Sequence, residues 1–571
     1  MPSETQAWPW LTSYPAGIAW DVRFPERSLV DYFEDSVARF PERPCLDFLG
    51  KIYSYDEVGD LVRRASQGFA ALGIGPGSRV GLMLPNTPYY VIAFYAVLRA
   101  GGTVVNINPL YAERELHHLI DDSGAEVVLT LDLRPIWDVL ERLRGKTALK
   151  TIVTCPMAEI LPFAKSLLYR AFRRRASAHP APGEGHLWFD ELVASDGAMS
   201  ARPVDPKRDV AVLQYTGGTT GVPKGAMLSH ANLAANMLQC RAWFPHFTPG
   251  AERTVAVLPF FHVFAMTVLL NLPISIGEEI VLLPRFELTQ LLKTIDRKRP
   301  TTFAGVPTLF TAMMGARHLN RYDLTSIRSC ISGGAPLPVE LKAQFEALTS
   351  CTLVEGYGLS EASPVVACNP LTGANKPGSV GMPLPGTIVE IVSLDDPDRV
   401  LPIGERGEVT VRGPQVMLGY WKNAEATAQV LRKGRLHTGD VGFLDRDGYL
   451  FLVDRIKDMI KAGGYNVYPR VIEEAIYTNP SVRECIVVGV PDPYRGQTIK
   501  AFIVVQEGQH LDEAELIAFL KDKLSPMEMP KRVEFRESLP KTLIGKPSKQ
   551  ALLDEEQARA ARSKSSGRSG A

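Results

Sequence analysis

The sequence has no excess of either charge and no paired-cysteine motif. Its 571 residues carry 63 Lys and Arg against 63 Asp and Glu. This balance argues against a nucleic-acid binder that relies on global positive charge, so we expect no nucleic-acid partner. The seven cysteines are scattered and form no CxxC pair. That usage is typical of reduced, buried thiols and indicates a cytoplasmic protein rather than a disulfide framework or a zinc site.

A secretion signal is also missing. The first residues, MPSETQAWPWLTSYPAG, have neither a basic start nor a continuous apolar core. One uncharged run, TVAVLPFFHVFAMTVLLNLPISIG at 254–277, is long enough to span a bilayer. Two prolines, His262 and Asn271 make a lipid-facing helix costly there. We therefore expect a strand, a turn at Pro259 and a buried helix.

The common nucleotide loop ending in Gly-Lys-Ser or Gly-Lys-Thr is absent, which excludes a P-loop kinase. A related string, YTGGTTGVPKG, occupies 215–225, but Lys224 follows Pro223 and Gly225 stands where the hydroxyl should be. Its glycines and its three threonine hydroxyls suit the binding of phosphate oxygens. Taken alone, the string is also compatible with a flexible β-turn.

Short β-branched runs alternate with helical patterns over residues 40–350. The runs are SRVGLML, GGTVVNI, AEVVLTL, DVAVLQY, EEIVLL and TTFAGV, and LTQLLKTIDRKR at 288–299 is an intervening amphipathic segment. This alternation predicts βαβ units with a mainly parallel sheet covered on both faces. Short strands with Gly and Asp turns at 378–453 indicate a small β-rich subdomain, and a compact α/β unit follows Arg455.

Residues 160–175, ILPFAKSLLYRAFRRR, place apolar residues at helical spacing beside five basic ones. Such a basic amphipathic helix is able to lie on an anionic membrane surface. A surface helix or loop packed over the core is the alternative, and the pattern alone leaves both open.

Five blocks resemble the adenylate-forming superfamily, which contains acyl-CoA synthetases, peptide-synthetase adenylation domains and beetle luciferases. They are YTGGTTGVPKGAMLSH, SGGAPLP (332–338), EGYGLSEASP (355–364), HTGDVGFLDRDGYLFLVDRIKDMIKAGGYNVYP (437–469) and LPKTLIGKPSKQAL (539–552). They stand in the order of that superfamily and cover about residues 30–553. Within it, VVNINPLYAERELHHLIDDSGAEVVLTLD, LPFFHVFAMTVLLNLPISIG and FAGVPTLFTAMM look most like bacterial long-chain fatty acid–CoA ligases.

The resemblance implies an α/β fold with a large N-terminal domain over 1–455, built of two doubly wound αβαβα sheets and a small β-barrel. A small mobile α+β domain would follow over 456–556. Residues 557–571 are small, polar and basic, and we expect them to be disordered.

The implied reaction joins a fatty acid to CoA through an acyl-adenylate, releasing AMP and diphosphate, with medium-to-long chains preferred. The alternatives are a ligase for aryl or short-chain acids, an enzyme that hands acyl-AMP to a carrier protein, and a silent acyl or nucleotide sensor. The implied partners are fatty acid, ATP, CoA and Mg²⁺. A homodimer and peripheral contact with the inner face of the membrane are left open.

By resemblance, Glu361 and Thr216 would hold Mg²⁺, and Ser360 would touch the α-phosphate. Tyr357 would stack on adenine, and Asp440 would accept hydrogen bonds from the ribose. The implied ATP- and AMP-binding set is Thr216, Gly217, Gly218, Thr219, Thr220, Gly221, Lys224, Gly333, Gly334, Ala335, Pro336, Gly356, Tyr357, Gly358, Ser360, Asp440 and Arg455.

Lys546 is the expected catalytic lysine, supported by Lys224 and Glu361. A lysine on a separate domain can bridge the acyl carboxylate and the α-phosphate as a compact positive charge. The block around it, GKPSKQ, departs from the family's usual Gly-Lys-Ile-Leu-Arg type. Lys541 and Lys549 are therefore rivals, although the preceding glycine favours Lys546.

The second half-reaction would need the C-terminal domain to rotate about Lys457, the implied hinge. Gly463 and Gly464 would then pack along the pantetheine arm of CoA, since glycines allow a close backbone approach. The acyl chain would contact apolar side chains around His262. This histidine either lies near the carboxylate, gates the acyl tunnel, or is a buried, hydrogen-bonded histidine. The implied acyl-binding set is Phe261, His262, Phe264 and Gly333.

Overall fold

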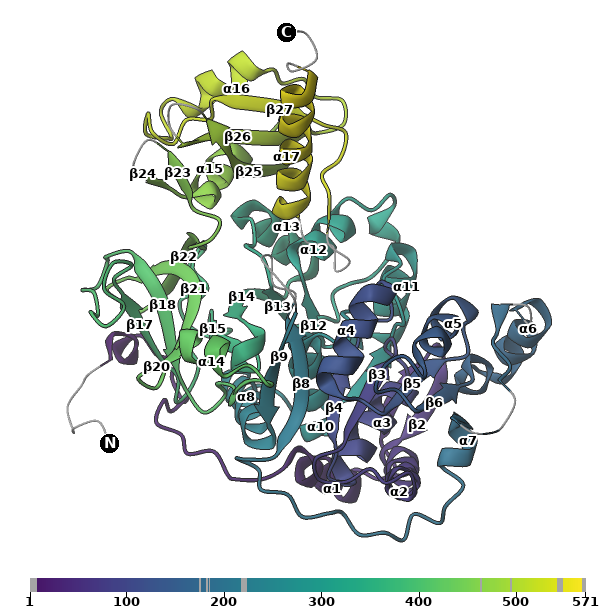
Figure 1. The fold of residues 1–571 in the computed structure, drawn as a ribbon. Helices are drawn as coiled ribbons and strands as arrows, with labels where there is room; N and C mark the ends of the chain where they lie inside the picture. The colour runs from purple at the N-terminus through teal and green to yellow at the C-terminus, as the bar shows by residue number, and fades with distance from the viewer. Residues whose placement is uncertain are drawn as a thin grey trace. The chain divides into compact units, whose positions relative to one another are not determined.

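The computed structural model describes residues 8–173, 176–180, 183, 185–216, 223–462, 465–492, 496–541 and 548–566. The chain packs as two compact units (Figure 1). The first comprises Met1–Ile388 and Val411–Leu436, and the second comprises Val389–Thr410 and His437–Ala571. Each unit has hydrophobic cores of its own.

A nine-stranded sheet runs through the first unit. Its inner strands are parallel, and both edges end in antiparallel pairs. In spatial order the strands are β16 (Met382–Pro383), β15 (Val365–Cys368), β14 (Thr352–Gly358), β13 (Ser329–Gly333), β12 (Thr302–Gly305), β10 (Arg253–Ala256), β11 (Glu279–Leu282), β1 (Pro44–Phe48) and β2 (Lys51–Ser54).

An eight-stranded sheet is the second layer of this unit. Strands β19, β9 and β8 pair in antiparallel fashion, and the pairs from β8 to β7 are parallel. The order is β19 (Gly419–Tyr420), β9 (Lys224–Ser229), β8 (Val210–Thr216), β4 (Thr103–Asn106), β3 (Arg79–Met83), β5 (Val127–Leu131), β6 (Thr151–Cys155) and β7 (His186–Trp188). The two mainly parallel sheets confirm the doubly wound α/β prediction.

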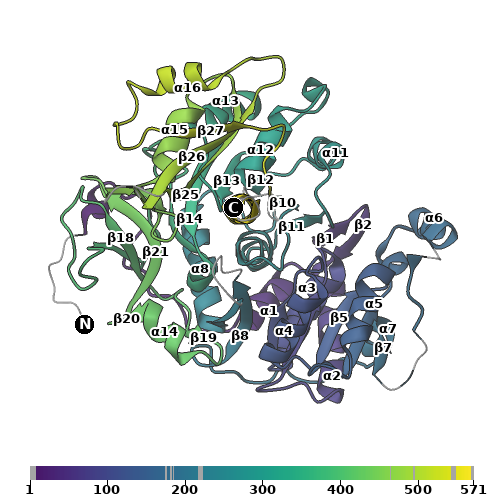
Figure 2. The same ribbon diagram turned by 45° about the horizontal axis from the view of Figure 1, so that its top comes forward.

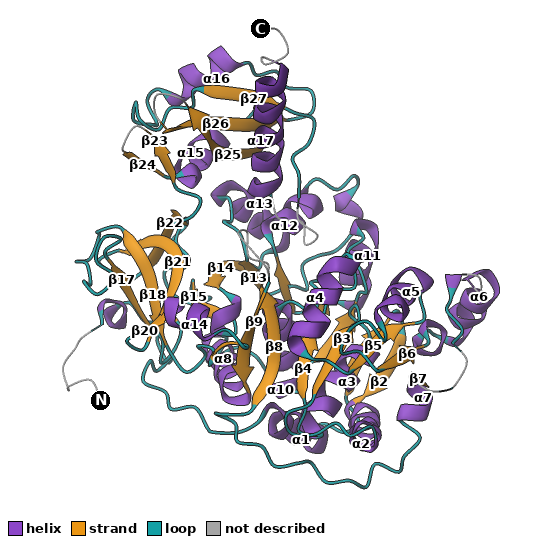
Figure 3. Ribbon diagram, in the orientation of Figure 1, coloured by secondary structure: helices purple, strands orange, loops and turns teal. Residues whose placement is uncertain are grey.

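Helices cover these sheets, as the purple ribbons of Figure 3 show. The apolar sides of α4 (Glu113–Ser123) and α5 (Arg134–Leu143) form one core with the eight-stranded sheet, and α11 (Leu288–Lys298), α12 (Pro307–Met314) and α13 (Val339–Thr349) form another with the nine-stranded sheet. Every residue of α3 (Pro88–Arg99) is buried, as expected for a helix that is apolar all round. The same unit also contains α1 (Leu29–Arg39), α2 (Tyr55–Ala71), α6 (Phe163–Arg173), α7 (Phe189–Leu192), α8 (His230–Trp243) and α14 (Ala424–Val430).

The uncharged run at 254–277 lies inside the first unit. It forms β10, a turn, and then a buried helix made of α9 (Val263–Ala265), the π-helical η4 (Met266–Asn271) and α10 (Leu272–Ser275). This arrangement confirms the predicted strand, turn and helix. In the part of the chain that the structure describes, no helix has the length and apolarity needed to cross a membrane.

The second unit holds two smaller sheets. One contains β17 (Ile388–Val392), β18 (Gly407–Arg412), β21 (Arg435–Leu444) and β20 (Leu431–Arg432) in that order, with β22 (Leu450–Arg455) beside β21. The other contains β24 (Tyr465–Val467), β23 (Ile460–Ala462), β26 (Gly496–Val505) and β25 (Val482–Asp492), with β27 (Arg532–Phe535) beside β26. Three helices, α15 (Pro469–Tyr477), α16 (Glu513–Leu520) and α17 (Lys549–Ser566), pack on this sheet (Figure 2).

Two details differ from the expectation, and the domain boundary is a third point to note. The β-rich subdomain has an open strand order, with ends at β17 and β20, where a small barrel was expected. The two compact units divide at other residues, and within the second unit the Asp454 carboxylate accepts the backbone N–H of Arg470 and ties β22 to the start of α15. The domain boundary at 455 stays a prediction. Helix α17 continues to Ser566, into the tail expected to be disordered, since QARAAR consists of good helix formers.

Candidate active site

Thr216 is the last residue of β8, and Lys224 is the first residue of β9. The loop that contains the predicted phosphate-binding glycines connects the two strands. The two residues are direct partners across the antiparallel pair. The Thr216 hydroxyl donates to the Lys224 carbonyl at 3.4 Å, and the Lys224 side chain is exposed. The remaining predicted loop residues, Gly217, Gly218, Thr219, Thr220 and Gly221, lie outside the described residues.

Gly225 occupies the place of the usual hydroxyl for a steric reason. A Cβ there would lie 3.2 Å from Cζ of Tyr215 and 3.5 Å from Cβ of Trp421. The Tyr215 hydroxyl donates to Asp122 at 2.5 Å, and the Trp421 indole N–H donates to the Asp122 carbonyl at 2.9 Å. A side chain at 225 would crowd the Tyr215 ring, which would have to shift by a few tenths of an ångström.

Tyr420 joins the two charged residues of this region. Its hydroxyl donates to Oε1 of Glu361 at 2.7 Å, and Nζ of Lys224 lies 5.3 Å from its ring centroid. Strand β19 holds it in place by pairing Tyr420 with Ala226 of β9. Burial, and to a lesser extent the Glu361 carboxylate, raise the pKa of Tyr420, so the phenol stays protonated and donates.

Glu361 lies in the short helix η6 (Ser360–Ala362), between β14 and β15. Its backbone carbonyl accepts the N–H of Met417 at 2.8 Å, which fixes it from the side of β19. Through Tyr420 and Lys224 the structure connects Glu361 to Thr216. One carboxylate and one hydroxyl beside the predicted phosphate loop would suit Mg²⁺, which usually keeps waters and shares its ligands with substrate phosphates. Among the described residues, no group of three or more His, Cys, Asp or Glu could hold a metal ion.

The residues predicted to line adenine lie at or just beyond the carboxyl ends of β13 and β14. Gly333 and Gly356 are partners across the parallel pair, and Gly334 has a φ of +79° that favours glycine. A Cβ on Gly358 would lie 2.2 Å from the Pro364 carbonyl oxygen, so only glycine fits there. Tyr357 is buried between these glycines. Ala335 is half-buried and Pro336 is exposed.

The expected ribose residues are paired within the second unit. Asp440 of β21 and Arg455 of β22 are cross-strand partners, and Nε of Arg455 donates to Oδ1 of Asp440 at 2.9 Å. Asp440 is buried, and its backbone N–H donates to the Thr438 hydroxyl at 3.1 Å. Arg455 is exposed. The carboxylate is therefore held in one orientation.

The expected acyl wall begins at Phe261 and His262. Buried amides fasten this segment: the side chain of Gln214 donates to the Phe261 carbonyl at 3.0 Å and accepts from Asn106 at 2.9 Å. The Asn86 carbonyl oxygen accepts the N–H of Phe260 at 2.8 Å. Sequence reasoning missed these amides, because a lone Asn or Gln at a strand end gives no signal of its long-range partner.

Phe264 lies directly against Gly333. A Cβ on that glycine would come within 3.2 Å of Cζ of Phe264. The structure thus brings two of the predicted acyl-binding residues together at the end of β13, where Gly333 pairs with the predicted adenine residue Gly356. His262 is half-buried, with its ring 6.2 Å from that of Phe261.

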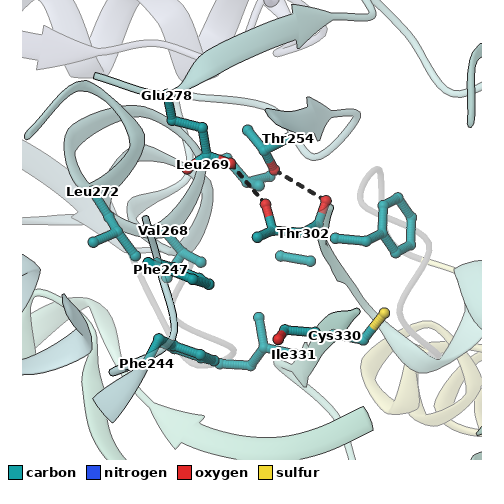
Figure 4. A pocket seen from close by; sticks show the side chains of 13 residues that line it. Phe244, Phe247, Thr254, Val268, Leu269, Leu272, Glu278, Thr302, Cys330 and Ile331 are labelled. Carbon is teal, nitrogen blue, oxygen red and sulfur yellow. Dashed lines mark hydrogen bonds between the residues drawn. The ribbon is translucent and has the colours of Figure 1, made fainter. Parts of the chain in front are cut away.

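A pocket lies between the helix that follows His262 and the opposite end of the nine-stranded sheet (Figure 4). Val268, Leu269 and Leu272 come from the helix, and Ile331 comes from β13. The wall is completed by Phe244, Phe247, Thr254, Glu278, Thr302, Phe303, Ala304, Ser329 and Cys330. Ile331 and Ser329 alternate with Gly333 along β13, so all three point to the same side of the sheet.

A sequence model of the family described as "AMP-binding enzyme" matches residues 33–421. The chain belongs to the AMP-binding enzyme family. A second model, described as "AMP-binding enzyme C-terminal domain", matches residues 471–546. These matches confirm the resemblance to adenylate-forming enzymes.

Individual relatives of this AMP-binding enzyme extend over nearly the whole chain. It is similar to the long-chain-fatty-acid–CoA ligase of Bacillus subtilis (strain 168), with 43% identity over 559 residues, 96% of this chain and 98% of that protein. A protein of the same name from Escherichia coli O6:H1 is 38% identical over 561 residues, with 96% and 98% covered. The solved structure of an anthranilate CoA ligase with anthranoyl-AMP has a TM-score of 0.83, with 27% identity, and 94% of this chain and 99% of that chain covered.

The C-terminal lysines of this AMP-binding enzyme have different surroundings. Nζ of Lys541 lies 2.9 Å from Oε1 of Glu484, and Nζ of Lys549 lies 3.2 Å from Oε1 of Glu473. Burial opposes the charge of Lys549, but the nearby carboxylates, Glu473 first, outweigh it and raise the pKa. Both rival lysines thus hold structural ion pairs. Lys546 lies outside the described residues.

Lys457 is exposed in the turn between β22 and β23. The turn is closed by the N–H of Asp458, which donates to the Arg455 carbonyl at 3.0 Å. This position lies within the second compact unit, not at its boundary. Gly463 and Gly464, the predicted CoA contacts, lie outside the described residues.

Proposed function

We propose that this AMP-binding enzyme is an AMP-forming fatty acid–CoA ligase that prefers medium-to-long chains. The observation that carries the proposal is the end-to-end identity of 43% with a long-chain-fatty-acid–CoA ligase. The reaction has two halves: a fatty acid carboxylate attacks the α-phosphate of ATP and expels diphosphate, and the thiol of CoA then displaces AMP from the acyl-adenylate.

The first half-reaction joins two anions, so its main obstacle is electrostatic. Lys224 and the adjacent loop would receive the β- and γ-phosphates that leave as diphosphate. Glu361 and Thr216 would hold Mg²⁺, which when bound neutralises phosphate charge. Asp440 would accept hydrogen bonds from the ribose, and Tyr357 would contact adenine. No enzyme nucleophile is needed, because the mixed anhydride is itself the activated species.

Lys546 is the proposed catalytic lysine. The ion pairs of Lys541 with Glu484 and of Lys549 with Glu473 support this choice, because both alternative lysines already pair with carboxylates of the second unit. A free ammonium near the α-phosphate would stabilise the charge that develops there. Gly463 and Gly464 would contact the pantetheine arm after rotation about Lys457.

The alkyl chain is proposed to follow the seam between the helix after His262 and strand β13. One end of this seam is the Phe264–Gly333 contact, and the other is the pocket lined by Val268 and Ile331. From Gly333 to Ser329 the strand rises about 13 Å, at roughly 3.3 Å per residue. Each methylene buried along it would contribute about 0.8 kcal/mol.

The nearest competing function is the same chemistry on an aryl or short-chain acid. A pocket limited to the region of His262 and Phe264 would favour that function. A chain that reaches the pocket at the far end of the same helix and strand would favour a longer substrate instead. Two further functions compete less closely: the delivery of acyl-AMP to a carrier protein, and the silent sensing of an acyl group or a nucleotide. Thioester formation with CoA separates the proposed ligase from both.

The proposal includes a cytoplasmic location with peripheral contact to the inner face of the membrane. All seven cysteines are buried and unpaired, which suits a reducing compartment. A homodimer stays a prediction, which sedimentation of the purified chain tests.

The test is diphosphate release and thioester formation with fatty acids from four to eighteen carbons, with an aryl acid as control. The proposal expects both products, with the highest kcat/KM for medium or long chains. Lys546→Ala should remove both products, whereas Lys541→Ala should retain them. Turnover of the aryl acid with no turnover of any fatty acid would overturn the proposal.

A further inference from the structure

Helix α6 presents its apolar side to solvent. Phe163 is 80% exposed and Phe172 is 82% exposed, with Leu167 at 53% and Leu168 at 58%. Ala164 and Ala171 are exposed as well. At about 100° per residue these six positions fill one half of the helix circumference. A surface helix of a globular protein normally turns this half inward, so α6 is oriented the opposite way.

The polar side of α6 faces the protein. Ser166 and Tyr169 are half-buried, and Nζ of Lys165 donates to the Leu49 carbonyl at 2.7 Å. The helix begins after Pro162, whose Cγ lies near the turn between β1 and β2 at Gly50. These contacts fix the outward direction of the apolar half, and α6 stands at the rim of the first unit in both Figure 1 and Figure 2.

The basic residues of α6 favour an anionic binding partner over a second copy of the helix. Its sequence, FAKSLLYRAFR, contains Lys165, Arg170 and Arg173 and no acidic residue. A second copy of the helix would bring like charges together, whereas an anionic lipid surface complements them. Eleven helical residues measure about 16 Å, too short to cross a bilayer but suited to lying in its interface.

We propose that α6 docks the enzyme on an anionic bilayer, with its apolar half buried among the headgroups and upper acyl chains. Two aromatic rings near the helix ends and two leucines between them supply the apolar contact. Basic residues on the same helix add attraction to anionic headgroups. The docking gives the enzyme access to apolar substrates that are dissolved in the membrane.

The test is flotation of the purified chain with vesicles, without ATP, CoA or fatty acid, so that its outcome is independent of the ligase reaction. Vesicles of phosphatidylcholine with one quarter phosphatidylglycerol should bind the chain, and pure phosphatidylcholine should bind it less. The double variant Phe163→Ser, Phe172→Ser should lower the partition coefficient by about tenfold or more. Arg170→Gln should lower it by about fivefold on anionic vesicles only.

The matched control is Phe286→Ser, Ile403→Ser, which removes two exposed apolar side chains elsewhere and should float like the wild type. All variants alter exposed positions, and equal thermal melting curves check that they fold. The proposal is overturned if the wild type does not float with anionic vesicles, or if the α6 double variant floats equally well. It is also overturned if the wild type dimerises in solution and the α6 variant is monomeric, because the apolar half would then be a self-contact.

Discussion

At the scale of single residues, Tyr420 connects the two charged residues of the proposed phosphate site. Its hydroxyl donates to Glu361, and its ring lies beside the Lys224 ammonium. Tyr420 thereby contacts both the Glu361 carboxylate and the Lys224 ammonium. The phosphate blocks of the sequence contain both charged residues but not this tyrosine, which follows far along the chain in MLGYWKN.

Tyr420→Phe should raise the KM for Mg·ATP by about tenfold while kcat falls less. The substitution keeps the ring near Lys224 and removes a hydrogen bond to a charged group, worth about 1.5–3 kcal/mol. Diphosphate exchange across a Mg²⁺ titration measures the effect, and Tyr420→Leu, which also removes the ring, should be worse. An unchanged Mg²⁺ dependence in Tyr420→Phe would show that the hydroxyl does not position Glu361.

Glu278 predicts a pH-dependent effect on stability. It is buried beside the pocket, where the Thr302 hydroxyl donates to its Oε1 at 2.8 Å, and burial raises its pKa to about 8. Between the ordinary glutamate pKa and about 8, the unfolded chain releases this proton and the folded chain keeps it. Stability therefore falls as pH rises through that window, by up to about 1.4 kcal/mol per pH unit.

Glu278→Gln removes this titration and preserves the shape of the neutral carboxyl. The variant should gain free energy of unfolding relative to the wild type at pH 8, with a smaller gain at pH 5. Urea unfolding followed by tryptophan fluorescence reports on the first unit, since all seven tryptophans lie there. An equal difference at both pH values would refute the pKa assignment.

At the scale of elements, the helix after His262 sets the length of the proposed acyl site. Val268 is buried in its π-helical turn and lines the pocket. Val268→Phe should fill space that a long chain would occupy, so kcat/KM should fall by about fourfold for every methylene displaced. An eight-carbon acid should keep its activity, and Val268→Ala serves as the enlarging control. If Val268→Phe lowered kcat/KM equally for short and long acids, the acyl chain would not bind beside Val268.

The turn at Lys457 should govern only the second half-reaction. Lys457→Pro restricts the backbone angle of a proposed hinge residue, and hinge positions absorb such changes during domain movement. Diphosphate release should stay within about threefold of the wild type, whereas thioester formation should fall by at least about tenfold. Lys457→Ala, which keeps a flexible backbone, should retain both. A parallel loss of both half-reactions in the proline variant would contradict the hinge assignment.

The sequence predicts most elements because buried parallel strands are nearly continuous apolar runs. SRVGLML and AEVVLTL became β3 and β5, and LTQLLKTIDRKR became α11 within one residue of its expected end. For residues 160–175 the spacing predicts an amphipathic helix but cannot say which side faces the protein. The contact of Lys165 with Leu49 decides that, and it joins segments distant in the sequence.

At the scale of the whole molecule, the division into units follows contacts that composition does not reveal. A change from α/β to β-rich texture near 378 is visible in the sequence, but the link from Asp454 to Arg470 joins that region to the C-terminal helix α15. Likewise, the amides of Asn106 and Gln214 are ordinary strand-end residues in sequence and become a network only when β4 and β8 pair. Motifs identify the chemistry, and tertiary pairing decides how its residues are held.

The central claim of the proposed function is that a fatty acid carboxylate attacks the α-phosphate of ATP. The attack is followed most directly with a fatty acid labelled with oxygen-18 in both carboxylate oxygens, with ATP, Mg²⁺ and CoA, and mass spectrometry of the products. After this attack, AMP should carry one labelled oxygen and diphosphate should carry none. Label in inorganic phosphate with formation of ADP, or unlabelled AMP beside the acyl-CoA, would contradict the proposed step.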